Sequence, residues 1–285
     1  MNERKRTWLI TGVSTGLGRA LAEAVLSRGE AVIGTLRKRE QLAEFEALAP
    51  GRAIAKLLDV TDRERVYAGV TQAIQAVGGI DVVVNNAGYG LSGAAEEVSD
   101  SEIRHQMETN FFGLVAVTQA ALPFMRAQKH GHIVNISSVA GYKGILGMSI
   151  YSASKFAVEG FSEGLAAEAG HLGIKVTIVE PGAFRTHWAS NSAIVRSARV
   201  IEEYAPTAGV VRAGLAKMDG QQENDPAKGA IAIIAVVDSP HPPLHLPLGP
   251  DSVRYLRDKL AAMTQELAAW EAVSLKTGFD SPAVR

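Results

Sequence analysis

The chain has 285 residues, of which 47% are hydrophobic and 21% charged, and a chain of this length can bury a substantial core without a metal or a disulfide framework. It contains no cysteine, which excludes disulfides, thiolate metal sites and a cysteine nucleophile. The 29 Lys and Arg residues nearly balance the 30 Asp and Glu residues, so the formal charge is −1. This balance gives no electrostatic reason to expect nucleic acid or an anionic membrane as a partner.

The N-terminus does not continue as a signal peptide, because glycines and hydroxyl residues follow the basic start at residues 1–6. The longest uncharged stretch, residues 109–125, contains Asn110, Gln119 and Pro123 and would make a poor membrane span. We therefore expect a cytoplasmic chain that does not enter the membrane.

Short apolar runs alternate with longer amphipathic stretches. The runs predict strands at residues 8–11, 31–36, 53–58, 81–85, 132–137, 175–179 and 244–247. The amphipathic stretches predict helices at residues 17–28, 40–48, 62–77, 101–128, 151–172 and 226–238. Several strands are unbroken apolar blocks, as is typical of strands covered on both faces. The alternation predicts an α/β fold, a Rossmann-like doubly wound parallel β-sheet with helices on both faces.

No linker or repeat divides the chain, so residues 1–285 are predicted to form a single domain. The periodicity weakens over residues 183–225, and a segment of this length is often a lid over a binding site. Residues 251–277 are expected to form a C-terminal helix packed back onto the body.

A glycine-rich turn follows the first predicted strand. Gly12, Gly16 and Gly18 allow a tight turn and let backbone N–H groups approach a pyrophosphate, and the next helix directs its positive N-terminus to the same place. The spacing G-x-x-x-G-x-G differs from the commonest Rossmann pattern, G-x-G-x-x-G. A plain strand-to-helix connection is the alternative, which the βαβ context disfavours.

The end of the second predicted strand bears on the choice of cofactor. A fold selective for NAD usually places a carboxylate there to bind the ribose hydroxyls. Here Arg37, Lys38 and Arg39 follow the strand, and the first carboxylate is Glu40. These cations suit a 2′-phosphate, with Arg37 as the bidentate candidate, so the sequence favours NADP(H), with NAD(H) as the alternative. Lys38 and Arg39 also fit a solvated helix start.

Tyr151 and Lys155 lie one turn apart on a predicted helix. A nearby ammonium favours the phenolate, which would lower the Tyr151 pKa from ~10 toward neutral pH. A Tyr-x-x-x-Lys pattern alone is frequent by chance. Further polar groups, however, reach the same sheet edge from separate segments, because strand C-termini face the ligand crevice in this fold. These groups are Asn85, Asn86, Asn110, Ser137, Ser138 and Thr186.

Together these motifs resemble the classical short-chain dehydrogenase/reductase family over residues 7–247. The matching segments are TGVSTGLG (11–18), Asp59 in LDVT, NNAG (85–88), Asn110 in TNFFG, Ser138 in NISSVAG, Tyr151 and Lys155 in YSASK, and PGAFRT (181–186). Ser138 precedes Tyr151 by 13 residues, the customary separation in the family. The resemblance implies an NADP(H)-dependent carbonyl reductase or dehydrogenase that interconverts a carbonyl and a secondary alcohol by hydride transfer.

The resemblance also implies roles for individual residues. Tyr151 would be the general acid in reduction and the base in oxidation, and Lys155 would lower its pKa and hold the nicotinamide ribose. Ser138 would orient the substrate oxygen, and Asn110 would hold a water molecule in a proton relay. The implied cofactor-binding residues are Gly12, Ser14, Thr15, Gly16, Leu17, Gly18, Arg37, Asp59, Val60, Asn86, Ala87, Gly88, Tyr151, Lys155, Pro181, Gly182 and Thr186.

No metal is expected. The pairs His130/His132 and His241/His245 sit beside Gly or Pro, and no carboxylate cluster joins them in the sequence. Ordinary surface or turn histidines are the better interpretation.

The substrate is expected to be a small-molecule carbonyl or alcohol. Apolar residues within 183–225 would admit a steroid-like or retinoid-like lipid, with a small polar ketone as the alternative. Tyr142, Ile145 and Leu146 are placed to line a pocket. The aromatic residues of the lid would either face substrate or pack the lid onto the body: Phe184, Trp188 and Tyr204.

Helices 101–128 and 151–172 carry apolar residues on more than one face, which is compatible with a subunit interface. The family resemblance implies a homodimer or a homotetramer. A catalytically silent NADP(H)-sensing regulatory protein of the same fold is the alternative function, disfavoured because both Tyr151 and Lys155 are present.

Overall fold

The computed structural model describes residues 5–186, 194–218 and 220–279. A seven-stranded sheet with the order β3-β2-β1-β4-β6-β7-β9 forms its centre. The strands are β1 (Thr7–Ile10), β2 (Ala31–Leu36), β3 (Ala53–Leu57), β4 (Val82–Asn85), β6 (Gly131–Ile136), β7 (Ile174–Pro181) and β9 (His245–Leu248). Each neighbouring pair is parallel. The predicted doubly wound fold is confirmed, with strand ends displaced by at most two residues.

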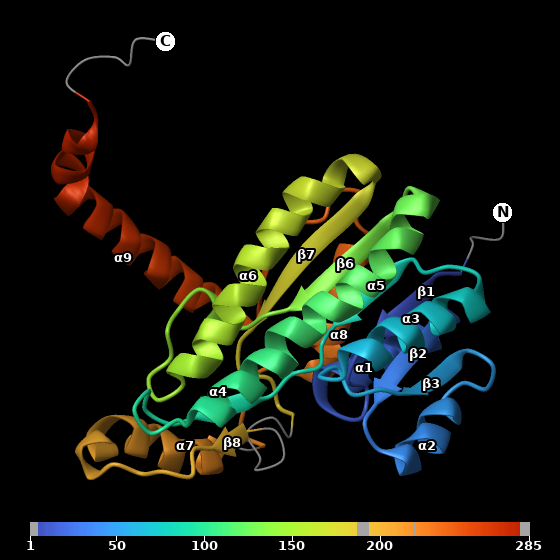
Figure 1. The fold of residues 1–285 in the computed structure, drawn as a ribbon, viewed down its shortest axis with the longest axis horizontal. Helices are drawn as coiled ribbons and strands as arrows, with labels where there is room; N and C mark the ends of the chain where they lie inside the picture. The colour runs from blue at the N-terminus through green and yellow to red at the C-terminus, as the bar shows by residue number, and fades with distance from the viewer. Residues whose placement is uncertain (1–4, 187–193, 219, 280–285) are drawn as a thin grey trace.

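Helices cover both faces of this sheet (Figure 1). Successive side chains of a strand point to opposite faces, so Trp8 and Ile10 pack in one core cluster and Leu9 in the other. The first cluster contains α1 (Gly16–Ser27), α2 (Leu42–Glu46) and α8 (Pro226–Asp238). The second contains α3 (Arg63–Val77), α5 (Gly113–Gln128) and α6 (Ser149–Ala169). Among the described residues, no helix has the length and apolar character that a membrane span needs.

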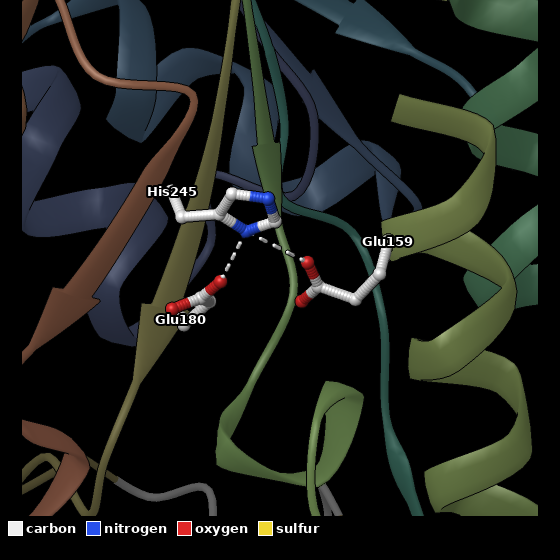
Figure 2. A group of neighbouring side chains, drawn as sticks. All are labelled: Glu159, Glu180 and His245. Carbon is white, nitrogen blue, oxygen red and sulfur yellow. Dashed lines mark hydrogen bonds and ion pairs between the residues drawn. The ribbon is translucent and has the colours of Figure 1, made fainter. Parts of the chain in front are cut away.

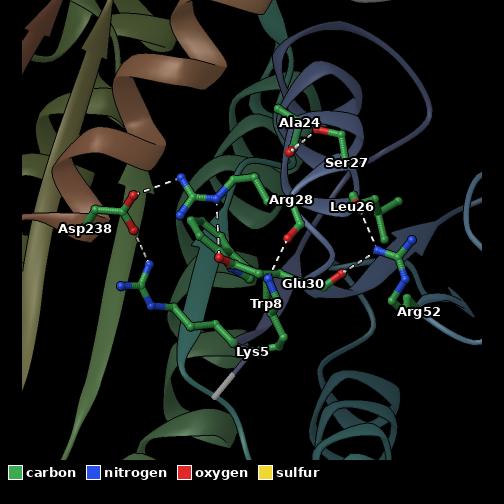
Figure 3. A network of polar contacts seen from close by, with 10 residues as sticks. Lys5, Trp8, Ala24, Leu26, Ser27, Arg28, Glu30, Arg52 and Asp238 are labelled. Atoms are coloured by element: carbon green, nitrogen blue, oxygen red, sulfur yellow. Dashed lines mark hydrogen bonds and ion pairs between the residues drawn. The ribbon is translucent and has the colours of Figure 1, made fainter. Parts of the chain in front are cut away.

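A network of polar side chains closes the amino-terminal edge of the sheet (Figure 3). The indole Nε1 of Trp8 donates to Glu30 Oε2 at 2.5 Å. The guanidinium of Arg28, at the end of α1, lies 2.9 Å from Asp238 Oδ2, at the end of α8. These contacts fix two helices to the beginnings of the strands. The polar groups of the candidate site lie at the opposite edge of the sheet, where the strands end.

The helix predicted at residues 101–128 is interrupted. Ser99 and Glu102 form a capping box at the start of α4 (Asp100–Met107), which stabilises a helix N-terminus. A π-helical turn, Glu108–Phe112, then leads into α5. Single π-helical turns are frequent at functional sites, and this one contains Asn110.

Residues 183–225 contain regular structure that the weak periodicity did not predict. The strand β8 (Ile194–Arg196) pairs in parallel with β5 (Gly90–Ser92), and α7 (Val210–Met218) follows. Buried Glu97 holds the segment, since its carboxylate lies 2.6 Å from Arg212 Nη2 and accepts the Ile201 N–H at 2.9 Å. Strands of three residues and a short helix are too brief for their periodicity to stand out.

The aromatic residues of this segment have different surroundings. Phe184 is buried in the first core cluster against α8, so it packs the segment onto the body. The Tyr204 hydroxyl donates to Glu96 Oε2 at 3.1 Å. Trp188 lies outside the described residues.

The C-terminal helix α9 (Pro250–Ser274) does not pack back onto the body, so that prediction is wrong. Its first turn contacts the body, but every residue from 260 to 279 is exposed, and the helix extends away from the rest of the chain (Figure 1). An amphipathic pattern predicts that one helix face is covered, but not which surface covers it.

Candidate active site

The glycine-rich turn after β1 is packed closely against the end of β4. Gly12 and Gly16 have φ angles of 72° and 67°, in the left-handed region that favours glycine. A Cβ atom on Gly18 would lie 2.3 Å from Asn86 Nδ2. That amide donates to the carbonyl oxygens of Thr11 and Gly12, both at 2.9 Å. The predicted glycines are therefore required here, and Asn86 adjoins the turn.

The N-terminus of α1 fits an anionic group. Its N-cap residue, Thr15, makes no side-chain cap, and the first turn contains no acidic residue. Backbone N–H groups and the helix dipole therefore face the turn without a side chain to satisfy them. Ser14 and Leu17 flank this end, and Thr186 lies across it, with its Cβ 3.6 Å from where a Gly16 Cβ would be. These residues fit the pyrophosphate of a nicotinamide cofactor.

Arg37 and Asp59 follow the neighbouring strands β2 and β3 and are both exposed. The Asp59 pKa is lowered: partial burial raises it, but hydrogen bonds from Thr61 and the charge of Arg37 outweigh burial. Within the described part of the chain, no hydrogen bond or ion pair occupies the Arg37 guanidinium. Val60 is buried against Gly113 at the start of α5. The ends of β2 and β3 thus present one cation and one anion next to each other at the carboxyl edge of the sheet.

The structure brings Ser138, Tyr151 and Lys155 together. Ser138 follows β6, and its Oγ accepts the Ala140 N–H at 3.1 Å, which fixes the hydroxyl. This hydroxyl is also hydrogen-bonded to the Tyr151 phenol. Lys155, one turn further along α6, donates to the Ile136 carbonyl oxygen at 2.8 Å. Tyr151 and Lys155 are 5% and 6% exposed, so their surroundings control their protonation.

Asn110 joins the loop after β4 to α6. Its Nδ2 donates to the Tyr89 carbonyl oxygen at 3.0 Å and to Ser154 Oγ at 3.1 Å, and its Oδ1 accepts the Tyr89 N–H at 3.0 Å. A Cβ atom on Gly88 would lie 3.1 Å from Asn110 Oδ1 and 3.7 Å from Lys155 Nζ. The amide therefore positions this loop beside the lysine, and its water relay stays a prediction.

The pKa of Tyr151 departs from the sequence expectation. Burial raises it to about 12, although the hydrogen bond with Ser138 acts to lower it. Burial also lowers the pKa of Lys155 to about 8, against the opposing effect of Glu159. The expected lowering of the phenol pKa by Lys155 is thus not found, because burial dominates. The phenol is protonated at neutral pH, the form that can donate a proton.

Sequence reasoning missed the residues that hold the loop after β7. The Ala183 N–H donates to Asp251 Oδ2 at 2.7 Å, and Asn224 Nδ2 donates to Asp251 Oδ1 at 2.8 Å. A Cβ atom on Gly182 would lie 2.0 Å from Asp251 Oδ1, so a larger residue there would displace this carboxylate. The available signal was Asp251 in the first turn of a helix beginning at Pro250, where the dipole favours an acid.

Apolar side chains surround the Tyr151 ring. Ala140, Met148, Ile145 and Val211 pack with it, and Val211 belongs to α7. The two other residues that the sequence placed at a pocket have different surroundings. The Tyr142 hydroxyl donates to the Ser252 carbonyl oxygen at 2.8 Å, and Leu146 is 58% exposed.

Two buried carboxylates, Glu159 and Glu180, meet His245 (Figure 2). The His245 Nδ1 atom lies 2.8 Å from Glu180 Oε1 and 3.6 Å from Glu159 Oε2. The expectation that no carboxylates join His245 is wrong, because residues far apart in sequence meet across β7, β9 and α6. The 2.8 Å contact is a hydrogen bond and leaves no space for an ion between these atoms. Burial raises the pKa of Glu159 to about 7, and burial also raises that of Glu180.

We expect Glu159→Gln to reduce the dependence of stability on pH. Folded Glu159 keeps its proton up to about pH 7, whereas an ordinary glutamate loses it near 4.5, so wild-type stability falls as pH rises through this window. The variant should gain about 1–2 kcal/mol in unfolding free energy over the wild type between pH 5 and pH 8. Denaturant unfolding at both pH values measures the gain. Glu168→Gln, an exposed position on the same helix, is the control, and an unchanged pH slope in Glu159→Gln would contradict the assignment.

The fold and these contacts define a Rossmann-like domain in which Ser138 lies beside the buried side chains of Tyr151 and Lys155 at the carboxyl ends of the strands. The sequence profile described as short chain dehydrogenase matches residues 6–194. The chain therefore belongs to the short-chain dehydrogenase family of oxidoreductases, as the motifs indicated.

Individual relatives agree with this assignment. Oxidoreductase BOA17 of Botryotinia fuckeliana is 41% identical over 271 residues, which cover 95% of this chain and 98% of the relative. The 3-ketodihydrosphingosine reductase of Bacteroides thetaiotaomicron is 39% identical over 244 residues, 85% of this chain and 87% of the relative. A short-chain dehydrogenase structure from Streptomyces avermitilis has a TM-score of 0.91 at 44% identity and covers 98% of this chain and 100% of that one.

Two more distant solved structures contain cofactors. ElxO with NADP bound has a TM-score of 0.70 at 28% identity, covering 85% of this chain and 96% of its own. A Burkholderia phymatum enzyme in complex with NAD has a TM-score of 0.73 at 26% identity, covering 82% of this chain and 85% of its own. Both nicotinamide cofactors thus occur among similar structures.

Proposed function

We propose that this protein is an NADP(H)-dependent reductase of a ketone carried on an apolar molecule. The observation that carries the proposal is the hydrogen-bonded pair of Ser138 and protonated Tyr151, held beside Lys155 at the carboxyl end of β6. Two hydroxyl groups at one point are suited to bind and protonate a carbonyl oxygen as negative charge develops on it.

In the proposed reaction, the bound cofactor supplies a hydride to the substrate carbon. The Ser138 hydroxyl, fixed by Ala140, orients the carbonyl oxygen. The Tyr151 phenol donates its proton to that oxygen, which gives the alcohol. Lys155, the buried cation one turn away, stabilises the phenolate left behind and is positioned to hold the nicotinamide ribose. Oxidation of an alcohol runs the same steps in reverse.

An apolar substrate is favoured by the surroundings of Tyr151. The neighbouring side chains Met148, Ile145 and Val211 offer no charge or hydrogen-bond donor. One relative is named for 3-ketodihydrosphingosine, a ketone. We therefore propose a ketone on a long apolar chain as the substrate class, with the part of the chain from β8 to α7 as the lid over it.

The proposed preference for NADP(H) depends on Arg37. Its guanidinium has no hydrogen bond or ion pair among the described residues, and it lies beside the strand end that carries Asp59. A guanidinium can bind a 2′-phosphate through two parallel hydrogen bonds. The cofactors of similar structures do not decide between NADP and NAD.

Nicotinamide absorbance tests the proposal. Purified protein is supplied with NADPH or NADH and a panel of 3-keto compounds of increasing chain length, together with short polar ketones. We expect NADPH oxidation that is at least ~10-fold faster with long-chain than with short ketones, since each buried methylene contributes about 0.8 kcal/mol. If protein that is shown to bind NADPH oxidises it with none of the ketones, the result would instead favour the cofactor-sensing alternative.

A further inference from the structure

The helix α9 is anchored at one end and exposed along the rest. Ser252, in its first turn, is fully buried and donates to the Glu180 carbonyl oxygen at 2.7 Å. Beyond the first turns, large apolar side chains stand in solvent. Their exposed fractions are 56% for Leu260, 51% for Met263, 62% for Leu267 and 65% for Trp270.

These side chains form a regular seam. Alternating steps of three and four residues separate Val253, Leu256, Leu260, Met263, Leu267 and Trp270. Such spacing is the heptad pattern by which two helices pack side by side. We propose that α9 is a dimerisation arm, whose seam packs antiparallel against the same seam of a second copy of this chain.

The antiparallel register is set by the apolar layers. When Leu260 lies opposite Met263 of the second copy, Leu256 lies opposite Leu267, and Val253 lies opposite Trp270. The twofold axis repeats each layer, so one patch is complementary to itself. Every seam position therefore meets an apolar partner.

Charges beside the seam favour the same register. In the antiparallel pairing, Lys259 of each copy flanks Glu266 of the other, which gives two ion pairs of opposite charge. In a parallel pairing, Glu266 would flank Glu271 of the other copy, which places like charges together. The sequence of the arm thus selects against the parallel arrangement.

The polar face of α9 does not suit a lipid surface. Helices that lie on membranes carry a basic polar face. Over Pro250–Ser274 the three basic residues Arg254, Arg257 and Lys259 are outnumbered by four acidic ones: Asp251, Asp258, Glu266 and Glu271. The mixed charge is typical of the flanks of a helix pair.

The mass of the assembly in solution tests the arm. Light scattering during gel filtration compares the full-length wild type with Leu260→Glu/Leu267→Glu, which places charge in the seam. We expect the mass of the variant assembly to be half that of the wild type. The matched control, Ala262→Glu/Ala269→Glu, places the same charges outside the seam and should leave the mass unchanged. Equal masses for the seam variant and the wild type would overturn the proposal.

Cysteine cross-linking tests the register, because the natural chain has no cysteine. A mixture of Leu260→Cys and Met263→Cys proteins should form a disulfide-linked pair under mild oxidation, and neither protein alone should. Cross-linking of each single variant with itself would indicate parallel arms and overturn the register. Sedimentation with phosphatidylcholine or phosphatidylserine vesicles is the remaining control. If the wild type binds vesicles and Leu260→Glu/Leu267→Glu does not, while both proteins have the same mass in solution, the arm binds a membrane and the proposal is overturned.

Discussion

Replacement of Tyr151 with phenylalanine is expected to lower kcat by at least ~10³-fold while cofactor affinity stays within a few-fold of wild type. The substitution removes only the hydroxyl. The ring still fills its place among Met148, Ala140 and Val211, so the fold and the glycine-rich turn are retained. What is lost is the proton that the buried phenol supplies to the substrate oxygen.

Two measurements on the same protein check this expectation. Steady-state reduction of a substrate found in the ketone panel gives kcat, and titration of NADPH fluorescence gives cofactor affinity. Tyr142→Phe is the matched control, since it removes a hydroxyl that bonds Ser252 rather than a group beside Ser138. Tyr142→Phe should retain kcat within a few-fold. Substantial turnover by Tyr151→Phe would refute the mechanism.

The second large effect is expected at Arg37. Arg37→Asp should lower the ratio of kcat/KM for NADPH to that for NADH by about 100-fold, which corresponds to about 2.7 kcal/mol. The substitution removes the proposed partner of the 2′-phosphate. It also places a second carboxylate beside Asp59, at a corner where Asp59 is already ionised, and two negative charges would repel that phosphate.

Initial rates with both cofactors at several concentrations give the ratio. Arg39→Asp introduces the same change two residues further along the exposed turn, so it controls for a general charge effect and should move the ratio by only a few-fold. If the ratio is the same in wild type and Arg37→Asp, Arg37 does not select the cofactor.

The sequence predicted the parts of this molecule that repeat a local pattern. Strands covered on both faces are unbroken apolar runs, and the three glycines of the turn occupy positions where φ or a close contact requires them. Ser138, Tyr151 and Lys155 were placed together because parallel strands end at one edge of the sheet. Local pattern and tertiary structure agree at these points, so short segments of sequence were sufficient to predict them.

The remainder depends on contacts that no local pattern contains. The Tyr151 pKa was misjudged because the pattern gives the distance along a helix to Lys155, but not the burial that outweighs it. His245, Glu180 and Glu159 meet only after two strands and a helix have come together. Likewise, the sequence predicted a C-terminal helix packed onto the body, whereas in the structure α9 is exposed from Leu260 onward.

The hydrogen bonds by which Asp251 holds the loop after β7 have a consequence for the order in which the protein folds during synthesis. Asp251 is synthesised 100 residues after Tyr151 and directly after β9, the outermost strand beside β7. While the chain is still on the ribosome, earlier strands and the tyrosine helix can assemble, but the Ala183 N–H still lacks the carboxylate to which it donates. The loop after β7 therefore gains its contacts with Asp251 only after β9 has been made, later than the segments that carry Ser138 and Tyr151.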